Sequence, residues 1–170
     1  MNFLLFLPVF CLAGFMLKLA DWLGEKKHGG FKSYLVAAVS AFLFWFLLKT
    51  NIETSTLMLS IVIGCVLALK VNRLNLVFGV GVLLVLMVLF GFQPPIFWLL
   101  PILTALVILD EYTHEKFSFV FFRFRGFLKT FILLLGLLGL LQPFNVLGFI
   151  IFDLTYDLTT IKIEKIVKVI

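Results

Sequence analysis

Residues 80–90 read VGVLLVLMVLF, a run without one charged, hydroxyl or amide side chain. Residues 131–141, FILLLGLLGLL, are equally apolar. A helix at the surface of a soluble protein keeps a polar face, whereas these segments are apolar on every side. They predict helices inside a lipid bilayer. A transmembrane β-barrel is the alternative, but it needs polar and apolar residues to alternate over roughly ten-residue segments, and these runs do not alternate.

The composition of the whole chain extends this prediction. Hydrophobic residues make up 63% of the 170 residues and charged residues 14%, and the mean hydropathy is +1.20. Soluble domains carry roughly a quarter charged residues, so a soluble chain of this length could not bury so much apolar surface. We expect an all-α, polytopic integral membrane protein.

Breaks at charges and at Pro, Gly and Asn clusters divide the chain into apolar spans. We expect seven spans, at residues 3–20, 34–48, 56–69, 74–92, 96–109, 127–141 and 144–158. Several are shorter than the roughly 20 residues that cross a bilayer, and the seventh is alternatively a half-helix. Residues 1–158 would form one transmembrane domain, and residues 159–170 a short cytoplasmic tail.

The basic residues predict the orientation of these spans. Thirteen of the fourteen lie in or beside the odd-numbered connections and the tail, and only Lys49 lies on the other side. Because basic residues collect in cytoplasmic loops, we expect the N-terminus outside, the C-terminus in the cytoplasm and a multi-pass location in the cell membrane. The calculated pI of about 9.4 follows from this topology, so we expect no nucleic-acid partner.

The same topology gathers acidic residues at the cytoplasmic face. Seven of the nine carboxylates come from three distant stretches, which also hold both histidines: Asp21, Glu25 and His28; Asp110, Glu111, His114 and Glu115; Asp153 and Asp157. Acids are costly at membrane depth, so their repeated placement at helix ends suggests a function. Cys11 and Cys65 lie inside predicted spans and are expected to be packing residues.

Helical spacing sorts these residues into faces. Residues four apart share a face, which aligns Asp110 with His114 and Asp153 with Asp157. Carboxylate and imidazole sets in helical bundles suit Mg²⁺, Mn²⁺ or Zn²⁺. We therefore expect a divalent-metal site built from Asp21, Asp110, His114, Asp153 and Asp157, with Asp110, Glu111 and Asp153 as catalytic residues. The alternative for Glu25, Glu115 and His28 is an ordinary solvated rim.

The connection at residues 116–126, KFSFVFFRFRG, interleaves phenylalanines with cations. Beside a membrane this pattern predicts an interfacial segment, with the rings at the acyl boundary and the cations at lipid phosphates. Arg123 and Arg125 are also candidates to bind a substrate phosphate, because guanidinium groups match phosphate oxygens in pairs.

Three functions follow from these patterns. The first is a divalent-metal-dependent enzyme that acts on a lipid or isoprenoid phosphate. The second is a cation- or proton-coupled small transporter, which needs a polar path that the outer half of the spans provides only at Thr56, Ser60 and a few glycines. The third is a structural or partner-binding membrane protein without catalysis. Membrane lipids are the expected partners in each case, and a homo-oligomer is compatible with all three.

Overall fold

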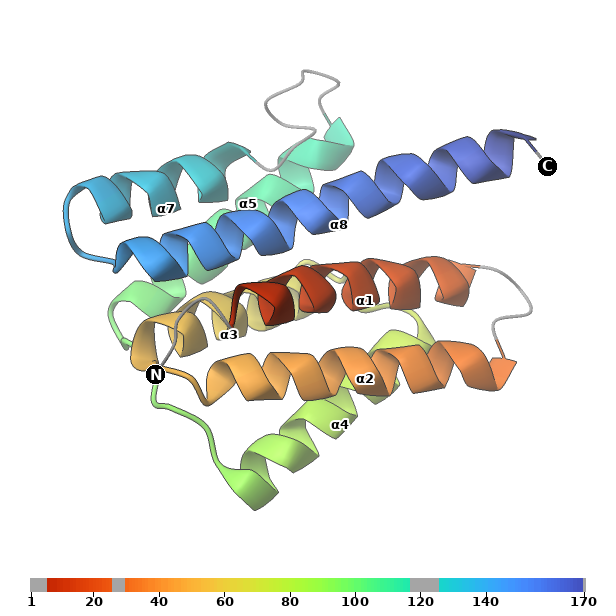
Figure 1. The fold of residues 1–170 in the computed structure, drawn as a ribbon, viewed down its shortest axis with the longest axis horizontal. Helices are drawn as coiled ribbons and strands as arrows, with labels where there is room; N and C mark the ends of the chain where they lie inside the picture. Colours follow the sequence, from red (N-terminus) through yellow and green to blue (C-terminus); the bar gives the residue numbers. More distant parts are fainter. Residues whose placement is uncertain (1–5, 26–29, 117–125, 170) are drawn as a thin grey trace. The chain divides into compact units, whose positions relative to one another are not determined.

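Every element of the described chain is a helix. The computed structural model describes residues 6–25, 30–116 and 126–169, and their side chains except at 114–116 and 162–169. Within these residues seven helices follow one another (Figure 1): α1 (Leu7–Glu25), α2 (Gly30–Leu48), α3 (Ile52–Leu67), α4 (Leu74–Phe90), α5 (Leu99–Lys116), α7 (Gly126–Leu137) and α8 (Pro143–Val169). The predicted all-α class is confirmed.

Prolines mark where several of these helices begin. Pro8 is the second residue of α1, Pro101 the third of α5 and Pro143 the first of α8. A proline fits the first turn because an N–H at that position has no acceptor within the helix. At the start of α3 the side chain of Asn51 accepts a hydrogen bond from the amide of Thr54, which caps the helix.

Three of the described helices are long and apolar enough to cross a membrane, judged by length and composition: α1, α2 and the part of α8 from Pro143 to Ile161. Helices α3, α4 and α7 are apolar but have 16, 17 and 12 residues. Helix α8 runs for 27 residues without a break, so it continues beyond the end of the predicted span at residue 158. The count of seven spans and the orientation of the termini stay predictions.

The chain divides into two compact units. Unit 1 comprises Met1–Trp45, Arg73–Leu89 and Leu147–Ile170, and unit 2 comprises Phe46–Asn72 and Phe90–Val146. Unit 1 therefore contains α1, all of α4 but its last residue, and most of α2 and α8. Unit 2 contains α3, α5 and α7, with the end of α2 and the first turn of α8.

In unit 1, small residues let helices approach closely. A side chain at Gly14 of α1 would collide with the backbone carbonyl of Phe152 in α8, and a Cβ at Gly148 of α8 would lie 2.5 Å from the ring of Phe10. Phe152 also packs edge-to-face against Phe44 of α2, with the ring centroids 5.6 Å apart. Close approach at glycines is a common way for helices to pack in lipid, where the hydrophobic effect does not drive association.

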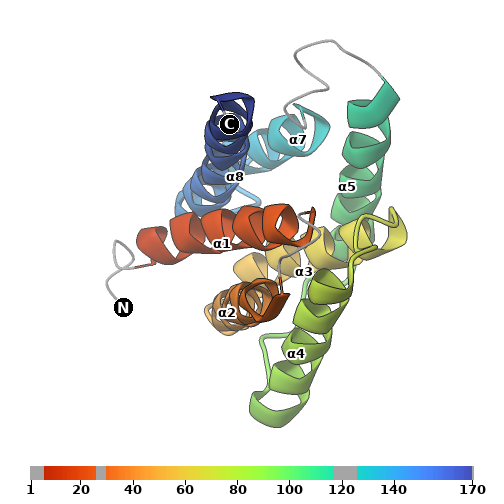
Figure 2. The same cartoon turned by 90° about the vertical axis from the view of Figure 1, so that its right-hand side faces the viewer.

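In unit 2, α5 packs against both α3 and α7 (Figure 2). A Cβ at Gly64 of α3 would lie 2.5 Å from the side chain of Val107 in α5, so this crossing also depends on a glycine. The hydroxyls of α3 bond to the segment before α5: Ser55 donates to the carbonyl of Gln93 at 2.6 Å, and Thr56 accepts from the amide of Ile96 at 2.8 Å.

Candidate functional site

The carboxylate of Asp110 lies at the start of a different helix from its own. Asp110 belongs to α5 and is 1% exposed. Its Oδ1 accepts from the amide of Phe127 at 3.0 Å and its Oδ2 from the amide of Leu128 at 2.8 Å. These amides are in the first turn of α7, where N–H groups have no acceptor within the helix. A carboxylate is favourable there because it satisfies the amides and opposes the positive end of the helix dipole.

Glu111, the next residue of α5, faces a cation. Its Oε2 lies 3.7 Å from the Nζ of Lys70, and the two side chains are 6% and 30% exposed. Lys70 follows α3, so this ion pair connects α5 to the α3 end of unit 2. Two neighbouring acids predicted to be catalytic thus contact α7 and the segment after α3.

The predicted acids of unit 1 lie on α1 and α8. Asp21 accepts a hydrogen bond of 2.8 Å from Lys18, one turn earlier on α1. The same ammonium lies 5.2 Å from the ring centroid of Tyr156 on α8, a distance typical of a cation–π contact. Asp153 is buried in α8 at 3% exposed, whereas Asp157 is half-buried.

One basic and one amide side chain donate hydrogen bonds to carbonyls in the last two turns of α1. Arg73 donates to the carbonyl of Gly24 at 3.1 Å and lies 3.4 Å from the carboxylate of Glu25, which is exposed. Asn75 donates to the carbonyl of Ala20 at 2.7 Å. The last four carbonyls of a helix have no intrahelical donor, and the carbonyl of Gly24 is one of them, so the contact with Arg73 stabilises the end of α1. Arg73 also places Glu25 in a solvated ion pair.

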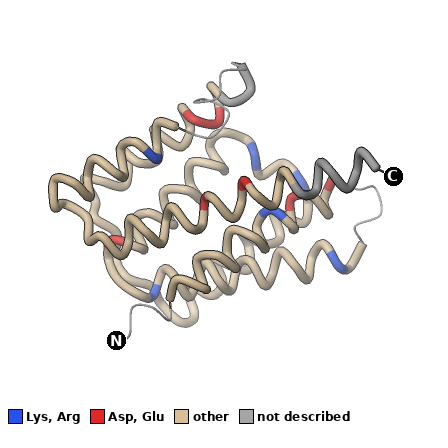
Figure 3. Tube along the Cα trace, turned by 45° about the horizontal axis from the view of Figure 1, so that its top comes forward, with Lys and Arg blue, Asp and Glu red and all other residues tan. Residues whose placement is uncertain are grey.

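Figure 3 shows the acidic and basic positions along the described trace. Among the side chains that the structure describes, no three of His, Cys, Asp or Glu come close enough to hold a metal ion. His28, Arg123 and Arg125 lie outside the described residues, as do the side chains of His114 and Glu115. The metal site and the phosphate-binding arginines stay predictions.

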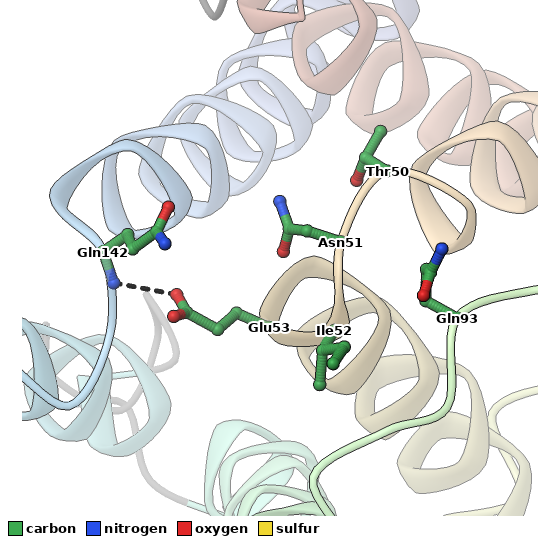
Figure 4. A pocket seen from close by; sticks show the side chains of 6 residues that line it. All are labelled: Thr50, Asn51, Ile52, Glu53, Gln93 and Gln142. Atoms are coloured by element: carbon green, nitrogen blue, oxygen red, sulfur yellow. Dashed lines mark hydrogen bonds between the residues drawn. The ribbon is translucent and has the colours of Figure 1, made fainter. Parts of the chain in front are cut away.

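A polar pocket lies elsewhere in unit 2 (Figure 4). Its volume is about 380 Å³, it is shallow and widely open, and its lining comes from three separate segments: Thr50, Asn51, Ile52 and Glu53; Gln93; Gln142. The first segment leads into α3, the second follows α4, and the third precedes α8. Five of the six lining residues carry hydrogen-bonding side chains, in a chain that is 63% hydrophobic.

A buried amide holds the carboxylate of this pocket in place. Asn145 is 0% exposed. Its Nδ2 donates to Oε2 of Glu53 at 2.5 Å, and its Oδ1 accepts from the hydroxyl of Thr54 at 2.8 Å and from the amide of Asn51 at 3.2 Å. The backbone amide of Gln142 also donates to Glu53 Oε2, at 2.8 Å. Glu53 is therefore fixed before any ligand arrives.

Sequence reasoning did not identify this pocket. Asn145 lies within the predicted span 144–158, and neither Glu53 nor Asn145 stands out by its spacing. The available signal was the set of amides in the connections opposite the basic ones, at Asn51, Gln93 and Gln142, with Asn145 close after the last of them. The partners Lys70, Arg73 and Asn75 were likewise not predicted as contacts of the acids and helix ends.

Comparison with protein-family models, with curated proteins and with solved structures finds no match to this chain.

Proposed function

We propose that this chain is a multi-pass protein of the cell membrane with a structural or partner-binding role, in which Asp110 and Glu111 join helices and do not carry out catalysis. The proposal includes the predicted topology, with the N-terminus outside and the C-terminus in the cytoplasm. The observation that carries it is the double hydrogen bond from the first turn of α7 to the carboxylate of Asp110.

The surroundings of both acids support this role. A metal ligand must direct lone pairs at a cation, and Mg²⁺ accepts only a nearly octahedral shell of oxygens. Both oxygens of Asp110 instead face amide protons at the positive end of a helix, which repel a cation. Glu111 faces the ammonium of Lys70. The competing hypothesis, a divalent-metal-dependent enzyme acting on a lipid or isoprenoid phosphate, would place a cation beside these amide protons and the Lys70 ammonium, both of which are unfavourable neighbours for it.

The exposed surface supports a role within the bilayer. Large apolar side chains are exposed along α4 of unit 1, including Leu74, Val77, Leu84, Val85 and Val88. Exposed apolar area of this kind marks contact with lipid or with a partner. Lipid acyl chains are the proposed first partner of this face.

The experiment is a thermal unfolding series on the detergent-purified full chain, combined with elemental analysis. We expect no divalent metal to co-purify, and Mg²⁺, Mn²⁺ or Zn²⁺ to leave the Tm of wild type unchanged. Asp110→Ala should lower the Tm by the same amount with and without each cation. A rise in Tm with one of these cations that Asp110→Ala and Asp153→Ala both abolish would instead establish the metal site and overturn the proposal.

A further inference from the structure

The pocket around Glu53 presents both kinds of hydrogen-bonding group. Each primary amide offers two donors and one acceptor oxygen, and the pocket holds three such amides, from Asn51, Gln93 and Gln142. The amide of Asn51 is engaged on both sides, by Asn145 and by the amide of Thr54. The side-chain amides of Gln93 and Gln142 make no hydrogen bond within the described part of the chain, so they are available to a ligand.

Glu53 adds a strong acceptor with a fixed position. Both hydrogen bonds that it receives from described residues end on Oε2, which leaves Oε1 to accept another. The geometry that holds the carboxylate comes from Asn145 and from the backbone of Gln142, and Figure 4 shows the side chain of Glu53 extended toward Gln142. A group that donates to Oε1 would meet an acceptor that loses no rotational freedom on binding.

The charges around the pocket disfavour an anionic ligand and leave only a small residual negative charge. Glu53 lies in the first turn of α3, where its negative charge offsets the roughly half positive charge of the helix N-terminus. The lining contains no basic residue, so an anion would meet only the carboxylate as a full charge. A cation would gain that carboxylate but would also approach the N–H groups at the helix end.

The volume of the pocket limits the size of the ligand. About 380 Å³ lies at the lower end of the roughly 300–1,000 Å³ range of small-molecule pockets, so a single ring fits better than a polymer. Hydroxyl groups both donate and accept, which matches a carboxylate beside two amides. We propose that this pocket binds a neutral polyhydroxyl group of the size of one sugar ring, either as a free sugar or as the headgroup of a glycolipid.

The predicted topology agrees with both sources. The three lining segments belong to connections that the positive-inside rule places on the outer face, where free sugars and the headgroups of the outer leaflet are accessible. The proposal does not depend on Asp110 or Glu111, which lie outside the lining of the pocket.

The experiment must avoid detergents with sugar headgroups, because a maltoside would occupy the site. The full chain is therefore purified in lauryldimethylamine oxide and placed in phosphatidylcholine nanodiscs. The probes are D-glucose and myo-inositol in solution, and monogalactosyl diacylglycerol within the nanodisc. The readouts are the thermal unfolding midpoint and the probe concentration at half-maximal stabilisation. Inorganic phosphate and choline serve as charged comparison ligands.

We expect at least one of the hydroxylated probes to raise the unfolding midpoint. A response to the soluble probes assigns the site to free sugars, and a response to the galactolipid alone assigns it to a headgroup. Glu53→Gln keeps the size of the side chain and one acceptor oxygen but replaces the other oxygen by an NH₂ donor. Gln142→Ala removes the side-chain amide and keeps the backbone hydrogen bonds of this residue. Each should weaken binding by about tenfold, the equivalent of one lost hydrogen bond.

Asn72→Ala is the matched control, because it removes an exposed amide of unit 2 that is not in the lining. It should leave binding unchanged. The proposal is overturned if no hydroxylated probe shifts the midpoint, or if phosphate or choline stabilises the protein more than the sugars do. It is also overturned if the two pocket variants bind as well as Asn72→Ala.

Discussion

The carboxylate of Asp110 in α5 accepts a hydrogen bond of 2.8 Å from the backbone amide of Leu128 in α7, across 18 positions of sequence. Capping residues usually precede the helix that they cap by one position. Here the capping residue belongs to α5, the preceding helix of the described chain. A single buried side chain therefore holds the start of α7 against α5 and accepts hydrogen bonds from two amides of its first turn.

Removing this cap should be costly. Asp110→Ala leaves the buried amide of Leu128 and the partly buried amide of Phe127 without their acceptor, and an unsatisfied buried group costs about 1–3 kcal/mol. We expect a loss of about 2–4 kcal/mol in the free energy of unfolding of the purified protein, and a smaller loss for Asp110→Asn, which keeps one acceptor oxygen. Thr130→Ala, at an exposed position of α7, should change stability by less than about 0.5 kcal/mol. Equal effects at both positions would contradict the capping role.

The Glu111–Lys70 ion pair should show a modest coupling. Lys70 is partly exposed, and exposed or partly exposed pairs typically contribute up to about 1 kcal/mol. A double-mutant cycle with Glu111→Gln and Lys70→Met should give a coupling energy of about 0.5–1 kcal/mol. The coupling should shrink between low salt and roughly 1 M salt, because ions screen partly exposed charges. Strictly additive single variants would show that the pair does not stabilise unit 2.

The approach of α1 to α8 should not tolerate a side chain at Gly14. Gly14→Ala directs a methyl group into the carbonyl of Phe152, and overpacking costs about 1–3 kcal/mol. Gly81→Ala is the matched control on α4, since nothing lies within 4 Å of a Cβ at that position. There the higher helix propensity of alanine should leave stability unchanged or raise it by up to about 1 kcal/mol. The order of the two unfolding midpoints tests this packing, and a reversed order would refute it.

The buried amide of Asn145 should control the shape of the polar pocket. Asn145→Leu removes the donor to Glu53 and the acceptor for Thr54 and Asn51, which leaves polar groups inside unit 2 without partners. Hydrogen bonds between helices in lipid average about 0.6 kcal/mol, with values up to about 1.7 kcal/mol, so we expect a total loss of about 1–3 kcal/mol. Asn72→Ala again provides the amide control. A stability equal to that of the control would show that the network is energetically neutral.

The proposed topology makes a direct labelling prediction. In a Cys11→Ala, Cys65→Ala background, a single cysteine introduced at Thr50 should react with a membrane-impermeant maleimide on intact cells. One introduced at Asn72 should react only after the membrane is permeabilised, because the basic connection that contains it is predicted to be cytoplasmic. Labelling of both on intact cells, or of neither, would refute the assignment of sides.

The helices were predictable because the signal is local. An uninterrupted apolar run such as residues 80–90 predicts a helix in apolar surroundings, whether these are lipid or protein, and α4 covers this run. Helix ends were less predictable: α1 continues to Glu25 and α8 to Val169, beyond the apolar residues that defined the predicted spans. Polar residues at these ends have adequate helix propensity, so the loss of hydropathy does not end the helix.

The candidate site was only partly predictable, because spacing identifies a face and not its partner. Asp110 and Asp153 are buried, and their predicted catalytic role stays a prediction. Nothing in the sequence indicated that backbone amides of α7 would donate to the carboxylate of Asp110. Backbone donors carry no sequence signature. The pocket around Glu53 forms where three connections lie close together in space. The periodicity of a sequence describes single helices, so it does not predict which connections meet.

Helix α8 measures about 40 Å, at 1.5 Å for each of its 27 residues, whereas a hydrocarbon core is about 30 Å thick. Its apolar portion, Pro143–Ile161, matches that thickness with almost no tilt. The remaining turns, which contain Lys162, Lys165 and Lys168, would then project as a rigid continuation of the span. Because no break separates the two parts, any change in the tilt of the span would tilt this basic end by the same angle and displace it sideways.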